Sequence, residues 1–363
     1  MQPNGDSVTY YPKHKVTFPV VTACIAVDDD RNITDPEFLK TVIEKNLEFG
    51  FINFFAGKSS TISSCCRLRS DMTQMEDYGY TNSIGGSSTK IGSIGVVSLN
   101  LPRIALLAEG DRDMFLSILK DYVYISAKIN NAKRHIIRRK IEEGVHPLYT
   151  LGFIDLTKQY STTGINGLYE AVDFMGLDIL EQNGQDFIFD ILRVINGTNK
   201  RCDKLYGSHH NVEQVPGESL SIKFAEKDIK LGVQNKYKIY SNQFIPLGVN
   251  ADMLDRIKLQ GMFDSQFSGG SILHINIENR IEDPQLIVDL LESSIRSGVI
   301  YQAINYVLAE CRDGHLTVSQ SDTCSICGAP IVSKYTRVVG FLSNIKNWHP
   351  ARRELDFPNR QFY

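Results

Sequence analysis

The chain has 363 residues and a formal net charge of −3, with 42% hydrophobic and 22% charged residues. This composition is typical of a globular protein with a substantial core, and the balanced charge gives no basic surface of the kind that binds nucleic acid. No apolar run approaches the ~20 residues of a membrane span, and Met1–Asp6 lacks the pattern of a signal peptide. We therefore expect a cytoplasmic protein that binds neither nucleic acid nor a membrane.

Two nearly continuous apolar runs flank a helix in the first part of the chain. Thr17–Val27 and Phe51–Phe55 have the composition of strands that are buried on both faces. Asp35 and Pro36 supply the N-cap and first-turn residues of a helix expected to end near Phe49. Strand, helix and strand at this spacing predict a βαβ unit and hence an α/β fold.

The chain then alternates between loops, strands and helices. Residues 59–93 form a Ser-, Gly- and Thr-rich loop, and polar loops of this length are usually functional or disordered. The expected elements that follow are a strand at 94–104 ended by Pro102, a helix at 111–143, a Gly-rich turn at 161–167 that opens a helix, helices at 185–205 and 220–228, a strand at 271–277 with His274 in the core, a helix from Pro284 and a strand at 299–308.

Four residues near the C-terminus have the spacing of a metal site. Cys311 and His315 precede Cys324 and Cys327, and together they predict a tetrahedral, structural zinc site of three thiolates and one imidazole. Free thiols or a redox dithiol remain the alternative. The site is expected to hold the loop that carries Gly340, which follows shortly after Cys327.

Cys65 and Cys66 lie in the polar loop beside Arg67 and Arg69. Neighbouring cations lower the pKa of a thiol, and loop placement keeps it accessible. A pair of ordinary buried thiols is the alternative.

The segment Pro216–Ser219 precedes a helix and includes Glu218 and Ser219. The backbone N–H groups of such a segment can bind an anion. An ordinary capped helix with Glu in its first turn is an equally good explanation.

Gly340 interrupts the apolar, β-prone stretch Thr336–Leu342. A bulge or the close approach of another backbone is the ordinary explanation. The alternative is storage of a backbone radical, because loss of a glycine α-hydrogen leaves a planar carbon between an amide nitrogen and a carbonyl. The stretch resembles the Arg-Val-x-Gly-Tyr/Phe signature of glycyl radical enzymes, which carry it near the C-terminus.

Several further segments, taken in order, resemble the anaerobic (class III) ribonucleotide reductases. The similar stretches are Thr17–Thr22, Cys66-Arg67, Gly95–Ile104, Thr163–Leu168, Pro216–Ser219, Gly269-Gly270, the cysteine cluster and the Gly340 stretch. The resemblance implies the C-terminal part of a ten-stranded α/β barrel. It places Cys66, next to Cys65, at the tip of a finger loop as the thiyl residue, and it makes Pro216–Ser219 the substrate phosphate loop. Ser93 and Asn100 are the other residues that it implies on the substrate side.

The resemblance also implies a mechanism and partners. A radical enzyme that uses S-adenosylmethionine and an iron–sulfur cluster would generate the glycyl radical on Gly340. The Gly340 radical would oxidise Cys66, which would start the reduction of a ribonucleotide, expected to be a triphosphate. The family forms homodimers. The implied domains are a partial barrel at 1–305 with its finger loop at about 59–93, a zinc knuckle at 306–333, and a radical loop with a C-terminal tail at 334–363.

The sequence departs from the family in three ways. Family members are much longer, so a separate N-terminal half is expected to complete the barrel. Ser93 stands where formate-using members have Asn, which leaves the reductant open, and His315 stands where a zinc cysteine is expected. The alternatives are an acyltransferase similar to pyruvate formate-lyase, a non-catalytic or split-gene fragment that acts only as a subunit, and a zinc-ribbon nucleic-acid binder.

Overall fold

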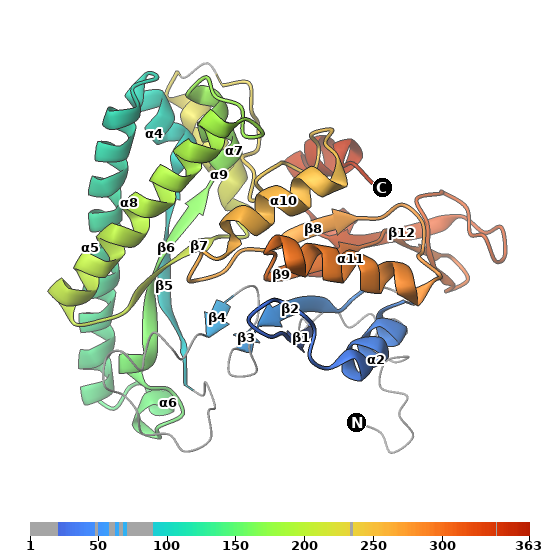
Figure 1. Ribbon diagram of the computed structural model, residues 1–363, viewed down its shortest axis with the longest axis horizontal. Helices are drawn as coiled ribbons and strands as arrows, with labels where there is room; N and C mark the ends of the chain where they lie inside the picture. The colour runs from blue at the N-terminus through green and yellow to red at the C-terminus, as the bar shows by residue number, and fades with distance from the viewer. Residues whose placement is uncertain are drawn as a thin grey trace.

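The computed structural model describes residues 21–47, 50–57, 90–232, 235–338 and 340–363, together with the backbone of 62–64 and 68–70. Figure 1 shows two groups of strands, each with helices on its outer side, and a further sheet that contains β12. Within these ranges, no helix combines the length and the apolar character that crossing a membrane requires.

The first sheet consists of three parallel strands, β5 (Gly92–Asn100), β6 (Gln159–Asn166) and β7 (His210–Gln214). Helices connect them, and long α5 and α8 lie on the outer side in Figure 1. The helices of this part are α4 (Leu101–Ala108), α5 (Arg112–Glu142), α6 (Pro147–Thr150), η2 (Leu156–Lys158), α7 (Leu168–Phe174) and α8 (Gln182–Tyr206). Ile165 and Val212 of the strands pack with Phe115 and Phe187 of the helices in one apolar core.

The second sheet has the strand order β1-β2-β9-β8. Its strands and helices are β1 (Thr22–Ala26), α2 (Pro36–Asn46), β2 (Asn53–Gly57), α10 (Met253–Asp264), β8 (Leu273–Asn276), α11 (Pro284–Ser297) and β9 (Tyr301–Asn305). β1 and β2 are parallel and joined by α2, which confirms the βαβ unit. β9 runs parallel to β8 and antiparallel to β2.

The two sheets meet between β7 and the residues before β8. Glu213 and Gly270 form a parallel bridge, and the N–H of Gln214 donates to the carbonyl of Gly270 at 3.1 Å. The described strands therefore follow one another in the order β5-β6-β7-β8-β9-β2-β1, with the first five parallel to each other and the last two reversed. Mixed α/β architecture is confirmed, whereas closure into a ten-stranded barrel stays a prediction.

A third, antiparallel sheet has the order β11-β10-β12-β13. The remaining elements are β3 (Ile62–Ser64) and β4 (Leu68–Ser70), α9 (Leu220–Lys230), β10 (Leu308–Cys311), β11 (Leu316–Val318), β12 (Ile331–Arg337), β13 (Leu342–Asn344), η3 (Ile345–Asn347), the π-helical turn η4 (Arg352–Asp356) and η5 (Phe357–Asn359).

Three expected elements differ from the structure. The strand expected at 94–104 ends at Asn100, whose Oδ1 accepts a hydrogen bond from the N–H of Arg103 and so caps α4. Pro102 lies in the first turn of α4, where proline is favoured, so it begins a helix. The turn expected at 161–167 is strand β6 up to Asn166, and the strand expected at 299–308 is divided between β9 and β10.

Candidate functional site

Gly340 lies in the tight turn between β12 and β13. Arg337 and Leu342 pair across the two strands, and the N–H of Val338 donates to the carbonyl of Phe341 at 3.3 Å. Gly340 itself is buried. We call residues 336–344 the glycine hairpin.

Among the described residues, nothing requires a glycine at position 340. Its φ lies outside the left-handed region, and no described atom comes within 4 Å of the place that a Cβ would occupy. Gly167 differs, since its φ is +77° and a Cβ there would lie 2.4 Å from Pro102. The ordinary reasons for a glycine, a left-handed backbone or a close neighbour, are therefore not found at Gly340. A chemical role for Gly340 stays a prediction.

Arg337 anchors the hairpin to the second sheet. Its Nη1 donates to the carbonyl of Gly50 at 2.8 Å and to Oδ1 of Asn305 at 3.1 Å, and its Nη2 donates to the carbonyl of Phe51 at 2.8 Å. Burial lowers the pKa of Arg337 to about 10, which still leaves the guanidinium charged at neutral pH. Charge-assisted hydrogen bonds therefore tie the hairpin to residues 286 and 287 positions away in the sequence.

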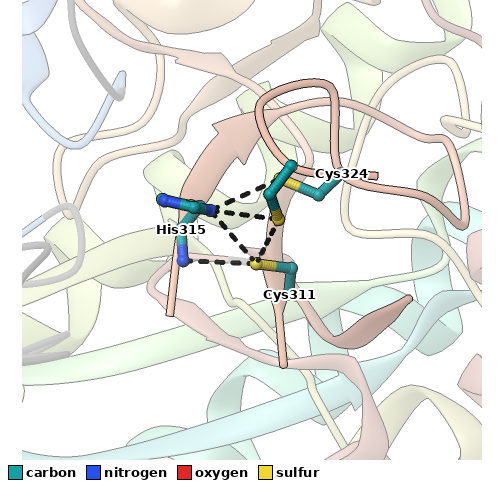
Figure 2. Close-up of side chains that lie close together, drawn as sticks. Cys311, His315 and Cys324 are labelled. Carbon is teal, nitrogen blue, oxygen red and sulfur yellow. Dashed lines mark hydrogen bonds between the residues drawn. The ribbon is translucent and has the colours of Figure 1, made fainter. Parts of the chain in front are cut away.

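The four expected metal ligands lie together, and Figure 2 shows the side chains of Cys311, His315 and Cys324 turned toward one another. Their ligand atoms and that of Cys327 all lie within 4.8 Å of one another. The Sγ of Cys311 is 3.8 Å from the Sγ of Cys327 and 3.6 Å from Nδ1 of His315. Zn–S bonds of about 2.3 Å and Zn–N bonds of about 2.1 Å, arranged tetrahedrally, give separations of about 3.8 and 3.6 Å. The donor set and its spacing therefore fit zinc.

Backbone amides support this cluster. The N–H of His315 donates to the Sγ of Cys311 at 3.3 Å, and the N–H of Ile326 donates to the Sγ of Cys324 at 3.4 Å. Hydrogen bonds from the backbone of Cys327 and Ile326 hold the pKa of Cys324 near 7, below its ordinary value. Metals bind the thiolate, so a thiol with a lowered pKa is ready to bind a metal at neutral pH.

The cluster and the glycine hairpin lie at opposite ends of β12. Cys311 pairs with Ile331 at the start of this strand, whereas Gly340 follows Arg337 at its end. Seven residues of strand correspond to about 20 Å. Among the described residues, the cluster is connected to the Gly340 loop through the paired strands β10 and β12, and its role in holding that loop stays a prediction.

The segment Pro216–Ser219 leads from β7 into α9 and presents free backbone donors. Among the described residues, none accepts a hydrogen bond from the N–H groups of Glu218, Ser219 or Leu220. Gly217 has a φ of +62°, and a Cβ there would lie 3.0 Å from Nδ2 of Asn166. The left-handed glycine turns the chain so that these donors precede α9, the position where a helix stabilises an anion.

The other expected substrate residues have protein partners. Ser93 lies in β5, and its Oγ is 2.9 Å from Oγ1 of Thr162. Asn100 caps α4, and its Nδ2 donates to the carboxylate of Asp228 at 3.0 Å. Contact of either residue with a substrate stays a prediction. Cys65 and Cys66 lie outside the described residues.

The face of the strands opposite the helices is polar, and we call it the inner face. Ile165, Val212 and Phe54 point to the helices, so the alternation of side chains along a strand puts Asn166, Asn211 and Asn53 on the other face. Each of these three buried amides has at least one atom without a protein partner among the described residues. Buried amides are normally satisfied, so this face is built to meet a polar ligand or water.

A cavity of about 260 Å³ lies beside the glycine hairpin, lined by residues 236–243 and 246–248, the C-terminal segment, Arg337 and Val338. Glu170 in its wall is buried, and its Oε1 accepts a hydrogen bond from the N–H of Ser241 at 2.8 Å. Its Oε2 has no partner among the described residues. Burial raises the pKa of Glu170 to about 8.

Three residues of the C-terminal segment escaped the sequence-based prediction. Arg352, Asp356 and Arg360 form a buried ion-pair cluster beside the cavity. Their spacing of four residues is the signal that could have revealed it, since residues four apart meet on a helical turn.

The chain matches, over residues 3–363, the family model described as anaerobic ribonucleoside-triphosphate reductase. It is 25% identical over 285 residues to the anaerobic ribonucleoside-triphosphate reductase of Haemophilus influenzae and 23% identical over 287 residues to that of Escherichia coli. Each match covers 69% of this chain and 40% of the relative.

Solved structures agree with this match. One structure of an anaerobic ribonucleotide reductase aligns with a TM-score of 0.86 and 34% identity, covering 98% of this chain and 57% of that one. The Thermotoga maritima anaerobic ribonucleotide reductase in complex with dATP and CTP aligns with a TM-score of 0.82 and 34% identity, covering 96% of this chain and 57% of that one. This chain therefore spans about half the length of the relatives it matches.

Proposed function

This chain belongs to the anaerobic ribonucleoside-triphosphate reductase family, and we propose that it carries the radical-storage site and the substrate-facing sheet of such an enzyme. The observation that carries the proposal is the environment of Gly340. A buried hairpin holds a glycine that neither its backbone conformation nor any described neighbour requires. The family match over the whole sequence disfavours the acyltransferase and nucleic-acid-binding alternatives.

The proposed reaction begins with removal of a hydrogen atom from Cα of Gly340 by an activating enzyme that uses S-adenosylmethionine and an iron–sulfur cluster. The Gly340 radical takes the hydrogen atom of the Cys66 thiol, and the resulting thiyl takes the 3′-hydrogen of the ribose. The 2′-hydroxyl leaves as water, and an external reductant supplies two electrons and two protons. Cys66 then returns a hydrogen atom to C3′. The protein contributes positioning and exclusion of water and oxygen.

The described residues support specific roles in this scheme. The N–H groups of Glu218, Ser219 and Leu220 would bind the phosphates of a ribonucleotide, expected to be a triphosphate. The unpartnered amides of the inner face, such as Asn211, would meet the polar nucleoside. Zinc held by the Cys311 cluster would be structural, because four protein ligands leave no open position for a reacting group.

The remaining polypeptide is expected to complete the barrel. β1 and β5 are the outer strands of the described seven-strand order, and strands from further polypeptide, in the same protein or in a partner, would pair with them. Within this scheme, residues 1–305 form the partial barrel, 306–333 the zinc knuckle, and 334–363 the radical loop and tail. A homodimer is the expected assembly.

The test combines spectroscopy with oxygen-dependent cleavage. With the activating enzyme, S-adenosylmethionine, a reductant, strict anaerobiosis and the N-terminal half, Gly340 should give a doublet in electron paramagnetic resonance. Admission of oxygen should then cut the backbone at Gly340. Absence of both signals from the complete mixture would refute radical storage at this residue.

The thiyl step is tested separately. Cys66→Ser should keep the Gly340 signal but form no deoxyribonucleotide, because a serine O–H bond is too strong to give up its hydrogen to the glycyl radical. Cys65→Ser is the matched control and should keep at least part of the activity. If Cys65 rather than Cys66 is indispensable, the assignment within this pair is reversed.

A further inference from the structure

Arg360 holds the backbone just before Gly340. Its Nη1 donates to the carbonyl of Arg337 at 2.7 Å, and its Nη2 donates to the carbonyl of Val338 at 2.8 Å. The Arg360 guanidinium also lies 4.9 Å from the ring centre of Trp348. The Arg360 side chain is 1% exposed, so it has little freedom to move. Its two hydrogen bonds therefore restrain these two peptide groups.

Arg352 holds the proposed phosphate segment in a similar way. Its Nε donates to the carbonyl of Glu218 at 2.9 Å, and its Nη2 donates to Oγ of Ser221 at 2.8 Å and to the carbonyl of Gly217 at 3.3 Å. The guanidinium therefore contacts the carbonyl side of the segment whose N–H groups are free. A cation at these carbonyls strengthens the peptide dipoles that an anion would meet.

Asp356 lies between the two arginines and joins them. Its Oδ2 accepts from Nη1 of Arg352 at 2.7 Å and from Nη2 of Arg360 at 2.9 Å, and its Oδ1 accepts from Nε of Arg360 at 2.8 Å. Burial alone would raise the pKa of Asp356, but the two guanidinium groups outweigh it and keep the pKa below its ordinary value. The carboxylate is therefore charged at neutral pH and fixed on both oxygens.

We propose that Asp356 is a positioning residue that couples the phosphate segment to the glycine hairpin through Arg352 and Arg360. A ribonucleotide that binds at residues 216–220 fixes the peptides that Arg352 contacts. Asp356 transmits this restraint to Arg360, and Arg360 transmits it to the carbonyls of Arg337 and Val338. The hairpin is then most ordered when substrate is present, which fixes the position of Gly340 at the time its radical is used. The inference rests on the proposed phosphate site.

Hydrogen–deuterium exchange of the full chain, with the N-terminal half when the two form a complex, tests the coupling. ATP and CTP are the probes, and the peptides covering 216–222 and 336–344 are followed. In the unchanged protein, the nucleotide should slow exchange in both peptides, by about tenfold in the hairpin, a typical coupling between two sites. Asp356→Asn should keep the slowing at 216–222 and lose it at 336–344.

Asp190→Asn is a matched control. Asp190 also bridges two arginines, Arg112 and Arg193, and its side chain is 16% exposed against 14% for Asp356. It lies on α8, and the hydrogen bonds of its carboxylate go to Arg112 and Arg193 and to neither segment, so its substitution should leave the nucleotide effect on the hairpin intact. Asp356→Glu should restore part of the effect, because it keeps the charge.

The following results would contradict the proposed coupling. Slowing at 336–344 that persists in Asp356→Asn, or is absent from the unchanged protein, overturns it. If Asp356→Asn does not fold, Arg352→Lys leaves the Arg360 contacts in place and should lose the coupling alone. A nucleotide that protects neither peptide also overturns the coupling, whereas the doublet signal of Gly340 tests the proposed function independently.

Discussion

The two ends of β12 are stabilised by contrasting means. At its start, Cys311, His315, Cys324 and Cys327 converge within a single short stretch of chain, and a zinc ion would hold them. At its end, the glycine hairpin is held by Arg337, which binds residues from the first part of the chain, and by Arg360. The contacts at the first end are local and would depend on the metal, whereas those at the other end are long-range, buried hydrogen bonds.

This difference has an energetic consequence. At a structural zinc site the metal-binding free energy is folding free energy, so loss of the metal should loosen the knuckle as a unit. The hairpin relies on charge-assisted hydrogen bonds, each worth about 1.5–3 kcal/mol. Each single substitution in the hairpin should therefore lower the free energy of unfolding by less than loss of the metal does. A chelator should not affect the hairpin.

The largest expected effect is that of Gly340→Ala. Because a Cβ at this position meets no described atom within 4 Å, the variant should fold with a melting temperature close to that of the unchanged protein. It should nevertheless give no doublet signal and no oxygen-dependent cleavage, since no glycine α-carbon remains there. Gly217→Ala is the contrasting variant: its φ of +62° makes a destabilisation of about 1 kcal/mol expected. A Gly340→Ala protein that still forms the radical would refute the site.

Cys324→Ser tests the knuckle. We expect about one zinc per chain in the purified protein by elemental analysis, and this variant should lose it. Exchange should rise in β10 and in the first residues of β12, while the glycine hairpin changes little because it lies about 20 Å away. Equal loosening at both ends of β12 would contradict the division between them, and retained zinc would contradict the ligand assignment.

Arg337→Met tests the hairpin. The substitution leaves the carbonyls of Gly50 and Phe51 buried without their donor, and we expect a loss of about 4 kcal/mol in the free energy of unfolding. Denaturant titration measures it, and the zinc content should stay unchanged. Arg139→Met on the exposed face of α5, with a side chain 67% exposed, is the control and should cost little.

Glu170, in the wall of the cavity beside the glycine hairpin, should make the stability of the protein depend on pH. Its pKa is about 8 in the folded protein, above the ordinary carboxyl value of 4.5, so the folded state holds this proton more tightly than the unfolded chain does. Stability from this group is therefore present at low pH and lost as the pH rises from about 4.5 to 8. Glu170→Gln should remove that loss, on the order of 3 kcal/mol, as measured by unfolding at pH 5 and pH 8. An unchanged pH profile would show that Glu170 ionises normally.

Local sequence patterns predicted the helices and strands whose formation depends on residues close together in the chain. Asp35-Pro36 and Asp283-Pro284 begin α2 and α11 as expected, because an N-cap carboxylate and a first-turn proline act within one helical turn. The Cys/His cluster was found for the same reason. β7 and α10 escaped prediction, because His210–Gln214 is buried yet polar and α10 buries Arg256, Gln260 and Asp264. Neither shows the usual apolar periodicity.

The sequence by itself therefore determined the α/β class and the grouping of Cys311, His315, Cys324 and Cys327, since each depends on residue type and short spacing. Only the tertiary structure decided what surrounds Gly340. The buried contacts of Arg337 with Gly50 and Phe51, and the path from Arg352 through Asp356 to Arg360, join segments far apart in the chain. No local pattern encodes such pairs, because their partners are mostly backbone carbonyls, which every residue carries and which only the fold brings together.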